Sequence, residues 1–206
     1  MTLLISFEGT EGSGKTTQIE LLHNLLQEKG YPVTSTREPG GTRIGEKIRK
    51  LLLAPEYREM VPLTEALLYA ADRAQHLEEV IAPALERGEV VITDRFFDAS
   101  LVYQGLVRGL GKEMVRRINS PLLEKFKPDL TFLLDLEPGE GMIRKEEQQQ
   151  GFGDRIESQS LGFHCRVREA YLQLARSEKR FSVIDASLSA ENIHRRIKEE
   201  VFSILD

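Results

Sequence analysis

The stretch Gly9-Thr10-Glu11-Gly12-Ser13-Gly14-Lys15-Thr16 matches the spacing GxxxxGK[ST] at every fixed position. Glycines in such a loop let successive backbone N–H groups turn inward and form a nest for phosphate oxygens. The lysine, here Lys15, reaches the β- and γ-phosphates, and the hydroxyl of Thr16 can ligate Mg²⁺. A helix that begins near Lys15 adds the positive end of its dipole. We therefore predict that residues Gly9–Thr17 bind ATP and that Lys15 is catalytic.

Five short apolar runs have the length and composition of buried strands. They are Leu3–Glu8, Tyr31–Thr36, Glu89–Thr93, Leu130–Leu136 and Phe181–Asp185. Strands that alternate with helices predict a mainly parallel sheet covered on both faces. We expect an α/β, three-layer P-loop kinase fold, with a five-stranded parallel sheet flanked by helices and a small lid. Such sheets bind ligands at the carboxyl ends of their strands.

Apolar residues at helical spacing predict which faces pack on this sheet. The first face is followed by Gly30, a typical helix stop, and consists of Ile19, Leu22, Leu25 and Leu26. A second face consists of Ile44, Ile48 and Leu51–Leu53, and a third, on a longer helix running toward Pro83, of Leu67, Leu68, Ala71, Ala74 and Leu77. Segments Leu161–Ala175 and Ala190–Leu205 have the same spacing.

No internal repeat and no Ser/Gly-rich or Pro-rich linker divides the chain, so residues 1–206 are predicted to form a single domain. The least regular stretch is Glu146–Asp154, which is polar and Gln-rich and contains Gly151 and Gly153. This composition fits either a disordered loop or a mobile lid. We assign a lid segment to about residues 141–157.

The overall composition narrows the classes of partner. The net charge is −5 and no basic stripe stands out, so we do not expect a nucleic-acid polymer as partner. Cys165 is the single cysteine and the four histidines are scattered, which excludes an intramolecular disulfide and argues against a zinc site. Because no apolar run approaches ~20 residues, and the start of the chain has the pattern of a strand, we expect a cytoplasmic protein without a membrane partner.

A P-loop by itself leaves the reaction open, because GTPases, motor ATPases and small-metabolite kinases share it. The chain has no guanine-reading Asn-Lys-x-Asp stretch and no Asp-x-x-Gly after a strand, and it is short for a helicase or motor. Phosphoryl transfer needs positive charge around an anionic transition state. Arg37 and Arg95 follow predicted strands, and Arg144 and Arg155 flank the polar stretch Glu146–Asp154. This placement favours a kinase, although each arginine taken alone fits a solvated surface residue.

The chain resembles the thymidylate kinases over nearly its whole length. The matching segments are Glu8–Thr17, Thr36–Thr42, Tyr69–Gln75, Asp94–Phe96, Ser100–Gly105 and Asp154–Glu157. Of these, only the P-loop is specific when taken alone, whereas the set in this order and spacing is highly specific.

The resemblance implies a role for each matching side chain. Arg37 and Arg95 would hold the acceptor phosphate, for which a planar guanidinium fork is well suited, and Arg95 would also bridge to the γ-phosphate. The remaining implied substrate contacts are Tyr69 stacking on thymine, Arg73 donating to a thymine carbonyl, Ser100 and Gln104 on the base edge, Tyr103 against the sugar 2′ position, and Glu11 near the 3′-hydroxyl or the magnesium shell. Asp94 would hold a magnesium-bound water. On pattern alone, Tyr69 fits a core aromatic equally, and Arg73 with Asp72 fits a surface pair.

Two features depart from the family pattern. The P-loop carries Thr10-Glu11 and no arginine, so the lid is expected to supply the transition-state arginine. Arg144 and Arg155 are the candidates, and Lys145 is a weaker one. In addition, Phe96 stands where tyrosine is common, so a hydroxyl contact is lost while the ring remains.

The sequence thus predicts a magnesium-dependent enzyme that converts ATP and dTMP to ADP and dTDP, a step in dTTP synthesis, by direct in-line transfer. The resemblance also implies a homodimer packed through helices. Two alternatives remain: a kinase for another nucleotide or deoxynucleoside, and a P-loop regulator without transferase activity. The regulator leaves Arg73, Tyr103 and Gln104 unexplained.

Overall fold

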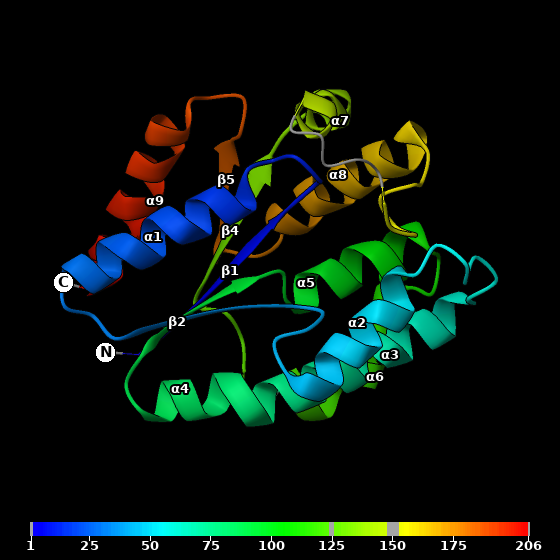
Figure 1. Cartoon of the computed structure of the whole chain (residues 1–206), viewed down its shortest axis with the longest axis horizontal. Helices are drawn as coiled ribbons and strands as arrows, with labels where there is room; N and C mark the ends of the chain where they lie inside the picture. Colours follow the sequence, from blue (N-terminus) through cyan, green and yellow to red (C-terminus); the bar gives the residue numbers. More distant parts are fainter. Residues whose placement is uncertain (1, 124–125, 148–152, 206) are drawn as a thin grey trace.

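The computed structural model describes residues 2–123, 126–147 and 153–205. Its strands are β1 (Leu3–Gly9), β2 (Val33–Arg37), β3 (Val90–Asp94), β4 (Leu130–Asp135) and β5 (Phe181–Asp185). They form one parallel sheet in the order β2-β3-β1-β4-β5, which confirms the predicted fold class (Figure 1). β2 begins two residues later than predicted. Pro32 precedes it and has no N–H to donate to a strand ladder.

Helices cover both faces of the sheet. The helical elements are α1 (Lys15–Glu28), α2 (Arg43–Leu53), α3 (Pro62–His76), η1 (Leu77–Ile81), α4 (Ala82–Glu86), α5 (Phe97–Ser100), η2 (Leu101–Val107), α6 (Lys112–Leu123), α7 (Pro138–Glu147), α8 (Leu161–Ala175) and α9 (Ala190–Leu205). Helices α1 and α9 pack together on one face, and η1, η2 and α8 pack on the other (Figure 1). None of these helices is long and apolar enough to cross a membrane, within the described residues.

Strand β1 carries the side chains that separate the two cores. Leu3, Ile5 and Phe7 point into the core beneath α1 and α9, whereas Leu4 belongs to the core on the α8 side. Because side chains alternate along a strand, Glu8 faces the same side as Leu4. Glu8 is fully buried at the carboxyl end of the strand, where parallel sheets bind their ligands. The strand therefore changes from apolar to polar toward the predicted site.

The predicted apolar face that begins on α3 is wrong within the helix, although Leu77, just after it, is buried as predicted. Leu67 is 50% exposed and Ala71 is also exposed, whereas the buried side of the helix carries Glu65, Asp72 and Arg73. Polar residues occupy this side because they bond to other segments around the cavity: Glu65 to Gln104, Asp72 to Gly40 and Arg73 to Glu38. In α2 Leu52 is fully buried as predicted, but Ile44 and Leu51 of the same predicted face are 49% and 39% exposed. These apolar residues therefore lie on the outer surface.

Two predicted boundaries also change. The helical ribbon that begins with α3 does not stop at Pro83 but continues through η1 into α4. The π-helical turns of η1 lie just before Pro83, which has no N–H for the regular helical ladder. Within the predicted irregular stretch, Glu146 and Glu147 belong to α7, and Gln148–Phe152 lie outside the described residues.

Candidate active site

A cavity of about 470 Å³ opens at the carboxyl ends of the strands. Its walls come from the P-loop, the segment after β2, helix α3, the segment after β3, η2, and residues on both sides of the undescribed lid stretch. Nearly all of the predicted ATP-binding and substrate-binding side chains therefore line one cavity, although they come from five separate parts of the chain.

The P-loop presents a nest of polar groups at one end of this cavity. Lys15 is 7% exposed, and its Nζ donates to the carbonyl oxygens of Gly9 and Thr10 at 3.3 and 3.0 Å. Burial and the nearby charge of Arg95 lower the pKa of Lys15. The hydroxyl of Ser13 is buried and has no hydrogen-bond partner in the described part of the chain. A phosphate would satisfy this hydroxyl and draw the Lys15 ammonium group away from the carbonyls.

Close backbone contact fixes the P-loop against α7. Gly12 has a φ of 73°, and a Cβ added there would lie 2.3 Å from the carbonyl oxygen of Gly141. A Cβ added at Gly141 would lie 2.2 Å from the carbonyl oxygen of Glu11. Glycine is thus required on both sides of this contact. The contact between Gly12 and Gly141 joins the P-loop to α7, the helix that leads into the lid segment.

Arg95 lines the cavity beside the P-loop and is held by three neighbours. Its Nη1 donates to the Tyr171 hydroxyl at 3.1 Å, its Nη2 contacts the Glu11 carboxylate, and its guanidinium lies 5.4 Å from the centre of the Tyr103 ring. The backbone of Arg95 has a φ of 66°, in the left-handed region that residues other than glycine rarely adopt. Such a conformation costs about 1–3 kcal/mol and is found most often at functional sites.

The pKa values of two carboxyl groups near Arg95 are shifted in opposite directions. Burial and repulsion from Asp98 raise the pKa of Glu8 to about 8, against the attraction of Arg95. Burial alone would raise the pKa of Glu11 as well, but the charges of Lys15 and Arg95 lower it to about 2. The environment therefore favours the charged form of Glu11 and the protonated form of the buried Glu8.

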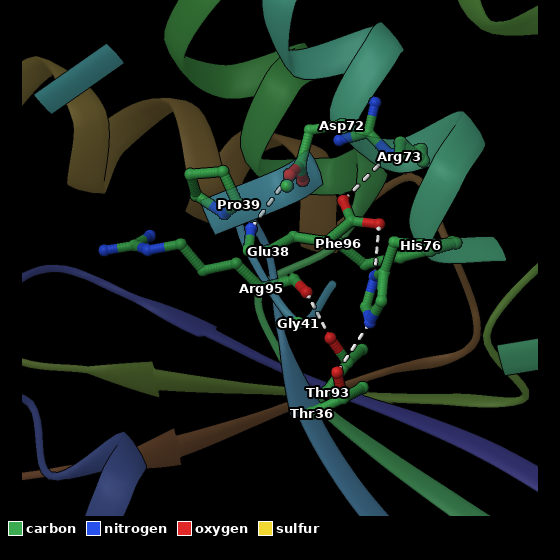
Figure 2. A network of polar contacts seen from close by, with 12 residues as sticks. Thr36, Glu38, Pro39, Gly41, Asp72, Arg73, His76, Thr93, Arg95 and Phe96 are labelled. Carbon is green, nitrogen blue, oxygen red and sulfur yellow. Dashed lines mark hydrogen bonds and ion pairs between the residues drawn. The ribbon is translucent and has the colours of Figure 1, made fainter. Parts of the chain in front are cut away.

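Arg73 is fixed by three side chains in a deep part of the cavity. The guanidinium donates from Nε to Glu38 at 2.9 Å, from Nη1 to Asn119 at 2.6 Å and from Nη2 to Ser100 at 3.0 Å. Figure 2 shows how the Glu38 carboxylate also contacts His76. Arg73 is 1% exposed, so it is not a surface arginine paired with Asp72. Its remaining N–H groups are available to a ligand.

Other predicted substrate contacts reach the same cavity. Tyr69 lines it and is half-buried, so its ring is not enclosed in the core. Gln104 lines it from η2 and donates from its amide nitrogen to Glu65 at 2.7 Å. Tyr103, also from η2, has a buried hydroxyl with no hydrogen-bond partner in the described residues. Arg37 lines the mouth of the cavity, where its half-exposed side chain donates to Glu46 at 2.9 Å.

The two lid arginines are not brought to this cavity. Arg144 donates to the carbonyl of Ala186 at 3.0 Å and to Glu140 at 2.6 Å. Arg155 is 4% exposed, donates to the carbonyl of Leu52 at 2.9 Å and pairs with Glu65 at 2.6 Å. Arg155 instead lines a separate, smaller cavity of about 230 Å³. Lys145, the weaker candidate, does line the main cavity and contacts Glu157.

The site also contains residues that sequence reasoning did not assign. Glu65, Asn119 and Tyr171 each hold a cavity-lining side chain: Gln104, Arg73 and Arg95, respectively. Their only local signal was a polar residue at a helical position that proves to be buried. Nothing in the sequence indicated which distant residue each would contact.

Thr16 and Asp94 offer oxygen donors for a divalent cation in this cavity. Asp94 Oδ1 is buried and, among the described residues, has no hydrogen-bond partner, and both Asp94 and Thr16 line the cavity. No group of three or more His, Cys, Asp or Glu side chains able to hold a metal occurs in the described ranges. Oxygen donors that leave most of the coordination to water and phosphate suit Mg²⁺. The residues present therefore fit this ion.

A phosphate nest on a parallel α/β sheet, with arginines opposite it in one cavity, defines a P-loop phosphotransferase. The model of the thymidylate kinase family matches residues 7–197. The chain is 51% identical over 200 residues to a thymidylate kinase of Halothermothrix orenii, covering 97% of this chain and 96% of that one. It is 49% identical over 203 residues to a thymidylate kinase of Pelotomaculum thermopropionicum, covering 98% and 94%.

A crystal structure agrees with the sequence comparisons. The thymidylate kinase of Ehrlichia chaffeensis superposes with a TM-score of 0.77 at 31% identity, covering 97% of this chain and 98% of that one. The chain belongs to the thymidylate kinase family. It is a phosphotransferase enzyme.

Proposed function

We propose that this cavity transfers the γ-phosphoryl group of Mg·ATP to dTMP and releases ADP and dTDP. The observation that carries the proposal is that Lys15 and Arg95 line one cavity, which continues to Tyr69 and Arg73. A triphosphate on the P-loop and a monophosphate nucleotide in the arginine-lined part would then face each other. Family membership supports the same reaction.

The chemistry requires positioning and positive charge more than a nucleophilic side chain. Lys15 would follow the transferring phosphoryl group. Arg37 would bind the acceptor phosphate, and Arg95 would contact acceptor and γ-phosphates together. Because Tyr171 and Glu11 already orient the Arg95 guanidinium, little reorganisation is needed when charge develops. Transfer would be direct and in line, without a phosphoenzyme.

The deep part of the cavity supports recognition of a pyrimidine. Tyr69 would stack on the base, Arg73 would donate to a carbonyl, and Ser100 and Gln104 would contact the base edge. Tyr103 would occupy the space of a 2′-hydroxyl, with its ring held against Arg95. Glu11 would approach the 3′-hydroxyl of the sugar.

Thr16 and Asp94 would hold Mg²⁺, Asp94 through a bound water. When bound, the ion neutralises charge on the β- and γ-phosphates. The chain's own residues would orient the phosphates and exclude water.

A catalytic role for a lid arginine stays a prediction. Before contacting a phosphate, Arg144 would have to leave Ala186 and Glu140. Arg155 would have to leave Leu52 and Glu65. Movement of the lid on nucleotide binding would provide such a change. If Arg144→Met and Arg155→Met both leave kcat unchanged, neither arginine stabilises the transition state.

Turnover of Mg·ATP with a panel of acceptors tests the proposed substrate. We expect dTMP to exceed dUMP, the ribonucleotide of thymine and thymidine in kcat/KM. Tyr103→Ala should chiefly reduce the difference in kcat/KM between the deoxyribonucleotide and the ribonucleotide of thymine. A bare nucleoside as the best acceptor would contradict the roles given to Arg37 and Arg95.

Exposed apolar side chains on α2, α3 and α6 support the further proposal of a homodimer. Helix α3 packs against both α2 and α6, and these helices lie together in Figure 1. Their exposed large apolar side chains include Ile44, Leu51, Leu63, Leu67 and Met114. A second copy would bury such a patch. Light scattering should give twice the chain mass, and Leu67→Glu should give a monomer; a monomeric parent enzyme would contradict the proposal.

A further inference from the structure

Glu65 lies at a junction between the base pocket and the lid segment. It is in the first turn of α3 and is 1% exposed. Its Oε1 accepts from the Gln104 amide at 2.7 Å, and its Oε2 contacts Arg155 Nη2 at 2.6 Å. Arg108 Nε is 3.5 Å from Oε1. The buried carboxylate is therefore balanced by guanidinium groups and accepts a hydrogen bond from a residue of the substrate cavity.

This contact determines which end of the Gln104 amide is left for a ligand. An ionised carboxylate has no hydrogen to donate, so the amide group that contacts Glu65 must be the NH₂. The carbonyl oxygen of Gln104 lies on the other branch of the amide. Gln104 is 1% exposed and lines the cavity, so its freedom to exchange the two ends is small.

The hydrogen-bond pattern of pyrimidines makes this orientation informative. Thymine and uracil carry a donor at N3 and an acceptor at O4, whereas cytosine carries an acceptor at N3 and a donor at its exocyclic amine. Arg73 has donors only, and its Nη2 bonds to Ser100, which precedes Gln104 by about one helical turn. An acceptor on Gln104 beside donors on Arg73 complements the edge of thymine or uracil.

We propose that Glu65 is a positioning residue that holds the Gln104 carbonyl oxygen toward the base and so selects pyrimidines with an N3–H over cytosine. The inference rests on the proposed function, because it requires a pyrimidine monophosphate in this cavity. Arg155 and Arg108 support it by holding the Glu65 carboxylate in place. Discrimination against the missing C5 methyl of uracil is a separate matter, in which Glu65 has no part.

The test compares kcat/KM for dTMP, dUMP and dCMP in the parent enzyme and in Glu65→Gln. An amide at position 65 can accept or donate, so Gln104 can turn its NH₂ toward the base. We expect the dTMP/dCMP ratio to fall about tenfold, since a site with the wrong hydrogen-bond partner loses discrimination of this order. The dTMP/dUMP ratio should stay unchanged, because both bases carry N3–H. General loosening of the pocket would change both ratios.

Three variants sharpen the result. Glu113→Gln is the matched control, because Glu113 forms an exposed pair with Arg117 on α6. In a Gln104→Ala background, Glu65→Gln should have no further effect on the dTMP/dCMP ratio, since Glu65 acts through Gln104. The double variant Glu65→Gln/Gln104→Glu reverses the pair and again leaves an acceptor at position 104, so it should recover part of the preference for dTMP.

Glu65→Asp provides a second route if Glu65→Gln does not fold. The aspartate side chain keeps the negative charge beside Arg155 but is one methylene too short to reach Gln104. The dTMP/dCMP ratio of kcat/KM should therefore again fall. An unchanged ratio in a folded Glu65 variant, with a changed ratio in Gln104→Ala, would overturn the inference. A parent enzyme that phosphorylates neither dTMP nor dUMP would instead overturn the proposed function.

Discussion

Arg95 is tied to Tyr171, whose hydroxyl accepts from Arg95 Nη1 at 3.1 Å and donates to the buried Glu8 carboxylate at 2.6 Å. A residue of α8 thus orients a guanidinium that follows β3, and a carboxylate of β1 orients the residue of α8. This chain of contacts explains how Arg95 keeps one direction in a cavity of about 470 Å³.

Removing the hydroxyl of Tyr171 tests this chain. Tyr171→Phe leaves the ring in place but removes an acceptor from Arg95 and a donor from Glu8. Because a lost hydrogen bond to a charged group is worth about 1.5–3 kcal/mol, we expect kcat/KM for dTMP to fall about tenfold or more. Steady-state kinetics measures the effect. Tyr57→Phe, at an exposed tyrosine, is the control, and equal activity of the two variants would contradict the proposed link.

The raised pKa of Glu8 predicts a pH dependence of stability. Burial raises the pKa of Glu8 to about 8 in the folded state. At pH values between the ordinary pKa of a glutamate and 8, the folded state therefore binds more protons than the unfolded state. The free energy of unfolding therefore decreases as pH rises through this window. Glu8→Gln removes the titrating group, and urea unfolding at several pH values should show a flatter profile. An identical pH profile in the variant would mean that Glu8 is ionised throughout.

The contact between Gly12 and Gly141 predicts a sharp difference between two glycines of α7. A Cβ at Gly141 would collide with the carbonyl of Glu11, whereas a Cβ at Gly139 meets nothing within 4 Å. We expect Gly141→Ala to destabilise the protein by about 2 kcal/mol and to raise KM for ATP. Gly139→Ala should stabilise it by about 0.5–1 kcal/mol. Thermal unfolding with and without ATP distinguishes them, and similar behaviour of both variants would refute the contact.

Lys15→Ala should lower kcat by about a thousandfold or more, because the charge that follows the transferred phosphoryl group is lost. The fold should survive, since the ammonium group bonds only to two loop carbonyls among the described residues. Lys29→Ala, at an exposed residue just after the same helix, serves as the control. Circular dichroism checks the fold and a coupled ADP assay the rate; a fall in kcat of less than tenfold would exclude the catalytic role.

Local sequence patterns predicted the parts of this protein that depend on local interactions. The P-loop, the five strands and the stop of α1 near Gly30 follow from spacing and backbone preference, and all of them appear in the structure. The apolar faces predicted for α2 and α3 were only partly right, because periodicity identifies an apolar side without saying what covers it. On α3 the buried side carries polar residues, since Asp72, Arg73 and His76 bond to the segment after β2.

The supporting residues of the site could not be predicted for a related reason. Glu65 and Gln104 are separated by 39 positions in the sequence, and Tyr171 and Glu8 by 163. Such pairs form only when the sheet brings distant segments together, and no local pattern encodes them. The lid arginines illustrate the opposite case. Their positions in the sequence suggested a catalytic role, but their side chains have other partners in the structure.

The most direct test of the account is product analysis after mixing the purified enzyme with Mg·ATP and dTMP. If the P-loop and Arg95 hold the two nucleotides in one cavity, dTDP and ADP should form in equal amounts, with little free phosphate. Formation of no diphosphate from dTMP or any other nucleoside monophosphate, or release of inorganic phosphate unaffected by the acceptor, would contradict it.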